Sequence, residues 1–466
     1  MMTLQQAHDW ITARSIPVEL VGTGQTRIQR VHTDTRTLQA GDLFVALKGE
    51  NFDAHDFLAQ AQGVGASAAI AHHGLREAGL PGLQVSDSRL ALGQLSLGWR
   101  SQFDLPLIAV TGSNGKTTVT QMIASILRAW KQDAAFATQG NFNNDIGVPL
   151  TLLRLRPEHR VGVVELGMNH PGEIAYLAGL TQPTIALVNN AQREHLEFMA
   201  TVEAVAAENG SVINALDAQG TAVFPADDDY TAVWQKIAGP RKVLTFALEG
   251  AADVTAQAHW SGTSWLVRAC TPSGPLEFTL AIAGRHNVKN ALAATACALA
   301  AAVPLASITA GLTDFLPVKG RSLAARVAVQ GHLLQLIDDT YNANPDSMRA
   351  AIDVLAELPG PRLLVMGDMG EVGDQGPQFH EEAGRHARTQ GIDKLFTLGE
   401  QSARAGSSFG EGRHFNDIDA LNLAVLAELS QLGSVLVKGS RFMQMERVVQ
   451  AIGAAHPTHT RAPHVA

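Results

Sequence analysis

The chain has few cysteines and no excess of positive charge, and each lack argues against a class of protein. Only Cys270 and Cys297 are present among 466 residues. This argues against a disulfide framework and favours a reducing compartment, by default the cytoplasm. The formal net charge of -9 and the pI near 6.0 argue against nucleic acid or an anionic membrane as the main partner. An anionic ligand must therefore be met by local positive charge.

The chain also lacks an export signal and a long apolar run. Its first residues, MMTLQQAHDWITARSI, are acidic and polar where a secretory signal needs a basic start and an apolar core. The most apolar window, ALAATACALAAAV at 291–303, is shorter than the ~20 residues that span a bilayer. We therefore expect a packed helix there and no membrane insertion. We also expect a monomer in solution.

The apolar pattern divides the chain into segments, since 466 residues exceed one hydrophobic core. Residues 1–104 alternate short apolar runs with Gly-Asp and Gly-Glu turns. Residues 105–318 contain LPLIAV, VGVVEL and TIALVN, continuous apolar runs typical of parallel strands buried on both faces. A break at FLPVKGRS, 315–322, starts a new alternation over 319–455, and a flexible tail is expected at 456–466.

These patterns predict an α/β fold of three domains. We expect a small N-terminal α/β domain, a central domain with a mostly parallel sheet, and a doubly wound, Rossmann-like C-terminal domain. In the last, the runs LLQLIDD, RLLVMGD, KLFTLG and SVLVKGS end in polar or Gly-containing clusters, and doubly wound sheets bind ligands beyond such strand ends. Asn344 and Pro345 predict the N-cap and first position of a helix over 347–358.

The segment VTGSNGKTTVT, residues 110–120, predicts a phosphate-binding loop between a strand and a helix. Glycines accept backbone dihedrals closed to other residues, so loop amides can face an anion at the helix N-terminus. Lys116 would reach the terminal phosphates and Thr117 would ligate magnesium. Val110 replaces the usual first glycine, which indicates a shorter loop; a plain Gly-rich turn is the alternative. The expected nucleotide contacts are Thr111, Gly112, Ser113, Asn114, Gly115, Lys116, Thr117 and Thr118.

A metal-bound nucleotide needs further ligands, and the next strands supply two. Glu165 stands at the carboxyl end of VVEL, where a buried strand would otherwise exclude a charge. His195 follows the next strand. Either residue alone could be structural, but together with Thr117 they predict a magnesium site.

Five motifs resemble the Mur ligase family: TGSNGKTT, NFNNDIGVPLTLL, ELGMNHPGEI, NNAQREHLE and GRHNVKNALAA. The resemblance covers nearly the whole chain and implies ATP-dependent amide formation through an acyl phosphate, with two Mg²⁺ ions. The end segments, 32–57 and DDTYNANPDSM onward, resemble the branch that joins D-alanyl-D-alanine (D-Ala-D-Ala) to UDP-N-acetylmuramoyl-tripeptide (UDP-MurNAc-tripeptide) in peptidoglycan synthesis. Another amide ligase of the family is the alternative.

The resemblance also implies roles for single residues. Lys116, His195 and Arg321 would act in catalysis, and Arg321 would enter the site when the last domain closes. Asn287 and Asn290 would contact adenine, with helix capping as the alternative for Asn287, and Asp338 or Asp339 would hold the ribose. The dipeptide side would include Asn342, Asn344 and Ser347. Asp368, Lys438 and Arg441 would face the dipeptide carboxylate or amine, with solvated loop roles as the alternative. The UDP-sugar contacts would be Thr33, Asp34, Thr35, Arg36, Lys48 and Asn51, with a turn and a charged loop as the alternative.

One position departs from the family pattern. Asn209 stands where many Mur ligases carry a lysine that is carbamylated to bind the second magnesium. Either Glu208 or a water would substitute, or that metal would sit differently. A phosphate-loop GTPase is a rival function, but no guanine-reading Asn-Lys-x-Asp follows a late strand, and a small-molecule kinase is a second rival. Folylpolyglutamate synthetase would not account for residues 32–57.

Overall fold

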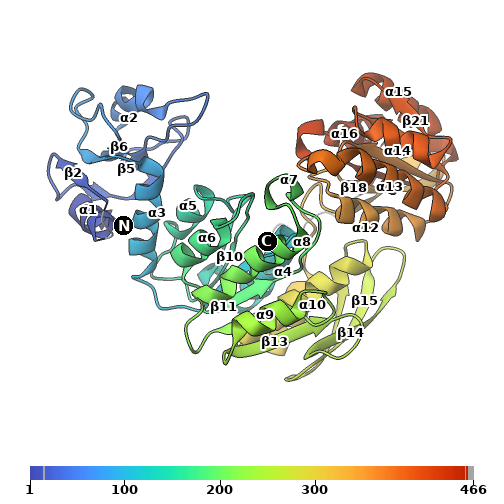
Figure 1. Cartoon of the computed structure of the whole chain (residues 1–466), viewed down its shortest axis with the longest axis horizontal. Helices are drawn as coiled ribbons and strands as arrows, with labels where there is room; N and C mark the ends of the chain where they lie inside the picture. The colour runs from blue at the N-terminus through green and yellow to red at the C-terminus, as the bar shows by residue number, and fades with distance from the viewer. Residues whose placement is uncertain (14–15, 457, 460–466) are drawn as a thin grey trace.

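The computed structural model describes residues 1–13, 16–456 and 458–459. Figure 1 shows three lobes in chain order, with the N-terminal and C-terminal lobes standing apart above the central one. Each lobe is built on one large sheet, and a separate pair joins β1 (Met2–Thr3) to β3 (Arg27–Ile28). The predicted three-domain α/β class is confirmed.

The N-terminal lobe has a five-stranded sheet in the order β2-β7-β6-β5-β4, parallel except at β2. Its strands are β2 (Val18–Val21), β4 (Arg30–His32), β5 (Asp42–Val45), β6 (Ala68–Ala71) and β7 (Gly82–Val85). Its helices are α1 (Leu4–Thr12), η1 (Ala54–Phe57), α2 (Leu58–Val64) and α3 (Ser88–Arg100). Asp87 caps α3 by accepting hydrogen bonds from the amides of Arg89 and Leu90.

The central sheet has nine strands in the order β16-β15-β14-β13-β12-β11-β8-β10-β9. The parallel strands are β8 (Leu107–Thr111), β9 (Ala135–Ala137), β10 (Val161–Glu165), β11 (Ile185–Val188), β12 (Thr221–Pro225), β13 (Lys242–Ala247) and β14 (Val254–Trp260). An antiparallel extension, which the sequence patterns did not predict, adds β15 (Trp265–Thr271) and β16 (Gly274–Leu280).

Helices cover both faces of this sheet and bury two apolar cores. They are α4 (Lys116–Lys131), η2 (Gln132–Ala134), α5 (Gly147–Leu152), α6 (Glu173–Thr181), α7 (Leu196–Met199), α8 (Val202–Gly210), η3 (Ser211–Ala215), α9 (Thr231–Ala238), α10 (Arg285–Ala300) and α11 (Leu305–Thr313). Val119, Met122 and Ile126 of α4 are buried, as their spacing predicts. The Ala-rich window lies mostly in α10 and is a packed helix.

The C-terminal lobe has a seven-stranded sheet in the order β21-β20-β19-β22-β18-β17-β23. Its strands are β17 (Leu323–Val329), β18 (His332–Asp339), β19 (Arg362–Gly367), β20 (Lys394–Leu398), β21 (Arg413–Phe415), β22 (Ser434–Lys438) and β23 (Thr458–His459). Its helices are α12 (Pro345–Ala356), η4 (Gly373–Gln375), α13 (Gly376–Thr389), α14 (Ser402–Phe409), α15 (Ile418–Glu428), η5 (Leu429–Gln431), η6 (Arg441–Met443) and α16 (Glu446–Ala455). Asn344 caps α12 and Pro345 is its first residue, as predicted.

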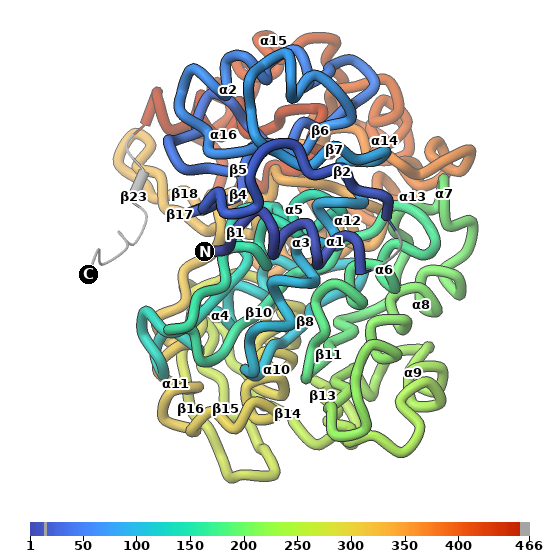
Figure 2. The backbone as a smooth tube through the Cα atoms, turned by 90° about the vertical axis from the view of Figure 1, so that its left-hand side faces the viewer, coloured from blue at the N-terminus to red at the C-terminus, as the bar shows by residue number. Residues whose placement is uncertain are grey.

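Part of the expected tail is strand, because Thr458–His459 pairs with β17; residues 457 and 460–466 lie outside the described residues. The view in Figure 2 shows α4, α10 and α11 together in the central lobe, with the N-terminal lobe above them. None of the described helices has both the length and the apolar character that a bilayer span needs.

Candidate functional site

The phosphate-loop segment connects β8 to α4, and its glycines are required by its shape. Gly112 has φ 132° and Gly115 has φ 82°, in the region that favours glycine. A Cβ atom on Gly115 would lie 2.6 Å from Oδ1 of Asn290. The amides of Ser113 and Asn114 do not face the cavity as expected, because the Ser113 amide bonds the Asn190 carbonyl oxygen and the Asn114 amide bonds Asn190 Oδ1. Asn190 therefore holds the phosphate loop in place through two backbone amides of the loop.

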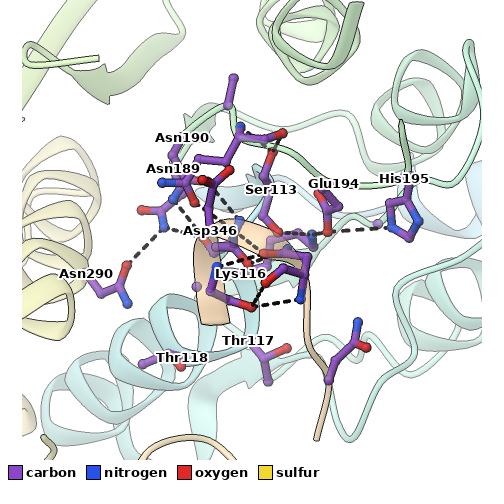
Figure 3. Close-up of a pocket in the computed structure, with 18 of the residues that line it drawn as sticks. Ser113, Lys116, Thr117, Thr118, Asn189, Asn190, Glu194, His195, Asn290 and Asp346 are labelled. Atoms are coloured by element: carbon purple, nitrogen blue, oxygen red, sulfur yellow. Dashed lines mark hydrogen bonds and ion pairs between the residues drawn. The ribbon is translucent and has the colours of Figure 1, made fainter. Parts of the chain in front are cut away.

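Lys116 is folded back onto the loop and is paired with an acid. Its Nζ donates to the carbonyl oxygens of Gly112 at 2.7 Å and Ser113 at 3.0 Å. It also lies 2.7 Å from Oε1 of Glu194, which Figure 3 shows on the side of His195. A bound phosphate would have to take over part of this coordination.

Thr117 and Glu165 meet, as the predicted metal site requires. Thr117 Oγ1 donates to Glu165 Oε1 over 3.0 Å, and the side-chain Nδ2 of Asn143 donates to the same oxygen over 2.8 Å. Glu165 is only 1% exposed, and its Oε2 has no hydrogen-bond partner among the residues that the structure describes. Asn143 comes from the NFNNDIGVPLTLL segment, to which the sequence analysis assigned no site residue.

His195 begins the short helix α7 in a left-handed conformation, φ 50°. Its Nδ1 lies 2.7 Å from Oε2 of Glu371, which itself has φ 59°. The imidazole holds the pKa of Glu371 below its usual value. Two non-glycine residues with positive φ in one contact indicate a functional location rather than a packing role. Glu371 belongs to the C-terminal lobe, so His195 lies where two lobes meet.

The side-chain amides of Asn287 and Asn290 form hydrogen bonds within the protein. Asn287 Nδ2 donates to the Ala283 carbonyl oxygen over 2.7 Å and is not a helix cap, since Gly284 precedes α10. Asn290 Nδ2 donates to Asn287 Oδ1, and Asn189 Nδ2 donates to Asn290 Oδ1. Both residues line the cavity below the loop, and the contact with adenine stays a prediction.

Neither Asn209 nor Glu208 presents a carboxylate to the cavity. Asn209 is fully buried, and its Oδ1 accepts a hydrogen bond from the Thr111 hydroxyl at 2.7 Å. Neither Asn209 nor Thr111 lines the cavity. Glu208 caps α6, because its two carboxylate oxygens accept the amides of Gly172 and Ile174. The prediction that Glu208 could replace the missing lysine as a metal ligand is therefore wrong.

The C-terminal lobe contributes Arg321 and Asp339 to the cavity. The Arg321 guanidinium lies 4.1 Å from the ring centroid of Tyr341, and within the described part of the chain its buried Nε has no hydrogen-bond partner. Asp339 Oδ2 accepts from Lys438 Nζ at 2.6 Å. Burial alone would raise the pKa of Asp339, but the Lys438 ammonium and two hydrogen bonds outweigh it and lower that pKa. Asp338 instead accepts from Thr340 and does not line the cavity.

Two C-terminal candidates lie outside the cavity, which corrects their assignment to the dipeptide side. Asp368 caps α14 by accepting the amides of Gln401 and Ser402. Arg441 is exposed and paired with Glu446. Asn342, Asn344, Ser347 and Lys438 do line it.

The N-terminal candidates form a separate group. Thr33, Asp34, Thr35 and Arg36 follow β4, while Lys48 and Asn51 follow β5, so both loops leave the same edge of parallel strands. Hydrogen bonds from Arg36 lower the pKa of Asp34 to about 2. The side chains of Arg36 and Lys48 are 85% and 65% exposed, and no member of the group lines the central cavity.

The cavity has a volume of about 890 Å³ between the central and C-terminal lobes, large enough for a nucleotide. It brings together most of the predicted residues of these two lobes, namely Ser113, Asn114, Gly115, Lys116, Thr117, Thr118, Glu165, His195, Asn287, Asn290, Arg321, Asp339, Asn342 and Asn344. Gly112 does not line it.

Sequence reasoning missed Arg193, which ties the two lobes together. Its guanidinium donates to Asp346 at 2.6 Å and Glu382 at 2.9 Å, and its amide donates to Asp346 at 2.8 Å. It also lies 5.2 Å from the ring centroid of Phe379. Its place two residues before His195 was the only signal.

A magnesium ion fits these residues. Across residues 1–13 and 16–456, no three His, Cys, Asp or Glu side chains form a ready-made metal cluster. Mg²⁺, however, is commonly held by one or two carboxylates with waters and phosphate oxygens. The buried, unpartnered Oε2 of Glu165, beside the hydroxyl of Thr117, is such a ligand position.

Comparison with known proteins assigns a family to this geometry. Three family models match: the Mur ligase family catalytic domain at residues 27–100, the Mur ligase middle domain at 110–298, and the Mur ligase glutamate ligase domain at 325–441. UDP-N-acetylmuramoyl-tripeptide--D-alanyl-D-alanine ligase of Escherichia coli K12 is 43% identical over 97% of this chain and 98% of its own length. The chain belongs to the Mur ligase family.

Solved Mur ligase structures agree. MurF from Acinetobacter baumannii matches with a TM-score of 0.87 and 37% identity, covering 97% of this chain and 98% of its own. MurF from Thermotoga maritima, solved in complex with ADP, matches with a TM-score of 0.81 and 26% identity over 92% and 97% of the two chains. The match extends over all three lobes.

Proposed function

We propose that the chain is an ATP-dependent amide ligase that joins D-alanyl-D-alanine to UDP-N-acetylmuramoyl-tripeptide. The observation that carries the proposal is one cavity lined by the phosphate loop, the Glu165 and His195 side chains and polar groups of the C-terminal lobe. Ligation needs a nucleotide, a carboxylate and an amine in one place. The 43% identity to the ligase of that name supports this choice of substrates.

The physical obstacle is the approach of a carboxylate to a phosphate. At ~4 Å and an effective dielectric constant of ~20, one pair of like charges costs about 4 kcal/mol. This corresponds to roughly a thousandfold in rate. Lys116 and Arg321 are two cations of the cavity wall, which also carries Arg193, Lys289 and Lys438. Magnesium, when bound, would neutralise the remaining charge on the terminal phosphates. Thr117 and Glu165 would hold one ion, and a second would lie near His195.

The remaining roles follow the order of the lobes. The tripeptide carboxylate would attack the γ-phosphoryl group of ATP, with ADP as the leaving group, to give an acyl phosphate. The dipeptide amine would then attack the acyl carbon, displace phosphate and lose a proton to form the amide. Asn342 and Asn344, on the C-terminal side of the cavity, would orient the dipeptide. The exposed loops that carry Arg36 and Lys48 would bind the UDP end of the other substrate.

Phosphate release tests the proposal. The enzyme is supplied with ATP, magnesium and UDP-MurNAc-tripeptide, with and without D-alanyl-D-alanine, and the product mass is measured. We expect ADP, phosphate and a new amide only when both substrates are present. Tripeptides that carry meso-diaminopimelate or lysine are supplied in turn to identify the third residue. A phosphorylated product without an amide would overturn the proposal in favour of a kinase.

A further inference from the structure

Glu194 lies on the wall of the central cavity and has a role still to be assigned. It precedes His195 in the loop after β11, and its side chain is 11% exposed. Its Oε1 lies 2.7 Å from Lys116 Nζ and 3.6 Å from Nε2 of His195. Figure 3 shows Glu194 between these two side chains.

The second carboxylate oxygen of Glu194 has no partner. Oε2 is buried and makes no hydrogen bond among the described residues. Leaving a buried charged oxygen unsatisfied is unfavourable, so such an atom marks a missing ligand or a functional group. Glu165 repeats the arrangement in the same cavity, with Oε1 bonded and Oε2 buried without a partner. Two such carboxylates beside a phosphate loop indicate more than one cation position.

The neighbouring helix α8 supplies no carboxylate to this cavity. Asn209 carries a neutral amide whose oxygen is bonded to Thr111. Both oxygens of Glu208 are used at the N-terminus of α6. Glu194 is therefore the acid that stands next to His195 on the cavity side.

We propose that Glu194 is a magnesium ligand, which pairs with His195 to hold a second divalent cation on the bound nucleotide. The inference rests on the proposed function in one respect, that the cavity binds ATP with magnesium. Carboxylate oxygen is the ligand type that Mg²⁺ prefers. When phosphate takes over Lys116, both oxygens of Glu194 become available to the cation.

The backbone around Glu194 is held by the C-terminal lobe. The amide and guanidinium of the preceding Arg193 are bonded to Asp346 at 2.8 and 2.6 Å. The following His195 is paired with Glu371 of the same lobe. Contact between the two lobes thus helps to position the ligand pair, which couples the second cation to lobe position.

Manganese binding tests the role of Glu194 without relying on turnover. Mn²⁺ replaces Mg²⁺, and bound Mn²⁺ is counted by electron paramagnetic resonance with a non-hydrolysable ATP analogue present. We expect two ions on the wild-type protein. In Glu194→Gln the second ion should bind at least ~tenfold more weakly, since a charged ligand is lost, and Glu194→Asp should recover part of the affinity. The control is Glu197→Gln, an exposed acid of the same segment outside the cavity.

Three results would overturn the inference. The first is unchanged affinity for both ions in Glu194→Gln. The second is a single ion on the wild-type protein. The third is tighter metal-free binding of the analogue by Glu194→Gln with unchanged Mn²⁺ affinity, because Glu194 would then serve only as the counter-ion of Lys116. Failure of the wild-type protein to bind the analogue at all would instead contradict the proposed function.

Discussion

The two outer lobes meet the central lobe through contacts of opposite character. On the N-terminal side, α3 packs apolar residues such as Leu92, Leu95 and Trp99 into a core shared with the central sheet. Trp99 Nε1 also donates to the Leu155 carbonyl oxygen at 3.1 Å. On the C-terminal side, Arg193 pairs with two acids, Asp346 and Glu382, beside a smaller apolar contact in which Leu196 and Ala283 meet the C-terminal core.

The difference indicates which lobe can move. Separating an apolar contact exposes apolar surface to water, which costs roughly 25 cal/mol of free energy per Å². Ion pairs and amide bonds at a lobe boundary can exchange for water at smaller cost, so polar interfaces favour relative motion. We therefore expect the N-terminal lobe to stay fixed and the C-terminal lobe to change position with ligands.

The largest expected effect is on the apolar contact. Trp99→Ala should lower the free energy of unfolding by about 3–5 kcal/mol, because it leaves a cavity and removes the bond to Leu155. Urea unfolding followed by circular dichroism measures the loss. Trp99→Phe, which keeps most of the volume, should lose less. If the two variants are equally destabilised, the packing volume of the Trp99 side chain is not what stabilises this contact.

The next prediction concerns Arg321, on the C-terminal side of the cavity. Arg321→Ala should reduce turnover roughly a hundredfold, because it removes a cation from the reacting phosphate, with little change in ATP affinity. Steady-state phosphate release and calorimetric titration of ATP separate the two. Arg326→Ala, at an exposed position of β17, is the control. Equal losses of turnover and ATP binding would refute a role confined to the reaction step.

Breaking the lobe contact itself should have a smaller effect. Arg193→Ala removes charge-assisted hydrogen bonds worth about 1.5–3 kcal/mol each, partly replaced by water, so turnover should fall roughly tenfold. Small-angle scattering should show a more open molecule. The control is Arg349→Ala, an exposed arginine on α12. An unchanged scattering profile would mean that other contacts hold the lobe.

The smallest effect concerns pH and the N-terminal lobe. His72 Nε2 accepts the amide of Ser88 at 3.0 Å, and burial followed by the charge of His55 lowers the pKa of His72. The unfolded chain protonates near the ordinary value of 6.5, so this stabilisation is complete above that pH and is lost as the pH falls below it.

Melting temperatures at about pH 7.5 and about pH 5.5 test this pH dependence. The wild-type drop should exceed that of His72→Gln by roughly 2 °C. His259→Gln, at an exposed position of β14 in the central lobe, should behave as the wild type. Equal drops in all three proteins would show that His72 does not titrate with folding.

Local patterns predicted the parts of the fold and site that depend on neighbours in sequence. Continuous apolar runs became β8, β10 and β11, and the Asn344-Pro345 pair begins α12, because burial and capping are decided within a few residues. The antiparallel β15 and β16 were missed, since no turn signal was recognised between them. Asp368 was assigned wrongly because a strand-end acid can serve a helix cap as well as a ligand.

The sequence by itself determined that a lysine, a threonine and a strand-end glutamate would surround a phosphate loop. Only the tertiary structure decided what those groups face. Lys116 and Glu194 are separated by 78 residues, and Arg193 and Asp346 by 153. Such pairs leave no periodic pattern in the chain, because they form only where strand ends and lobes are brought together. Their charges are satisfied by folding, and not by their neighbours in sequence.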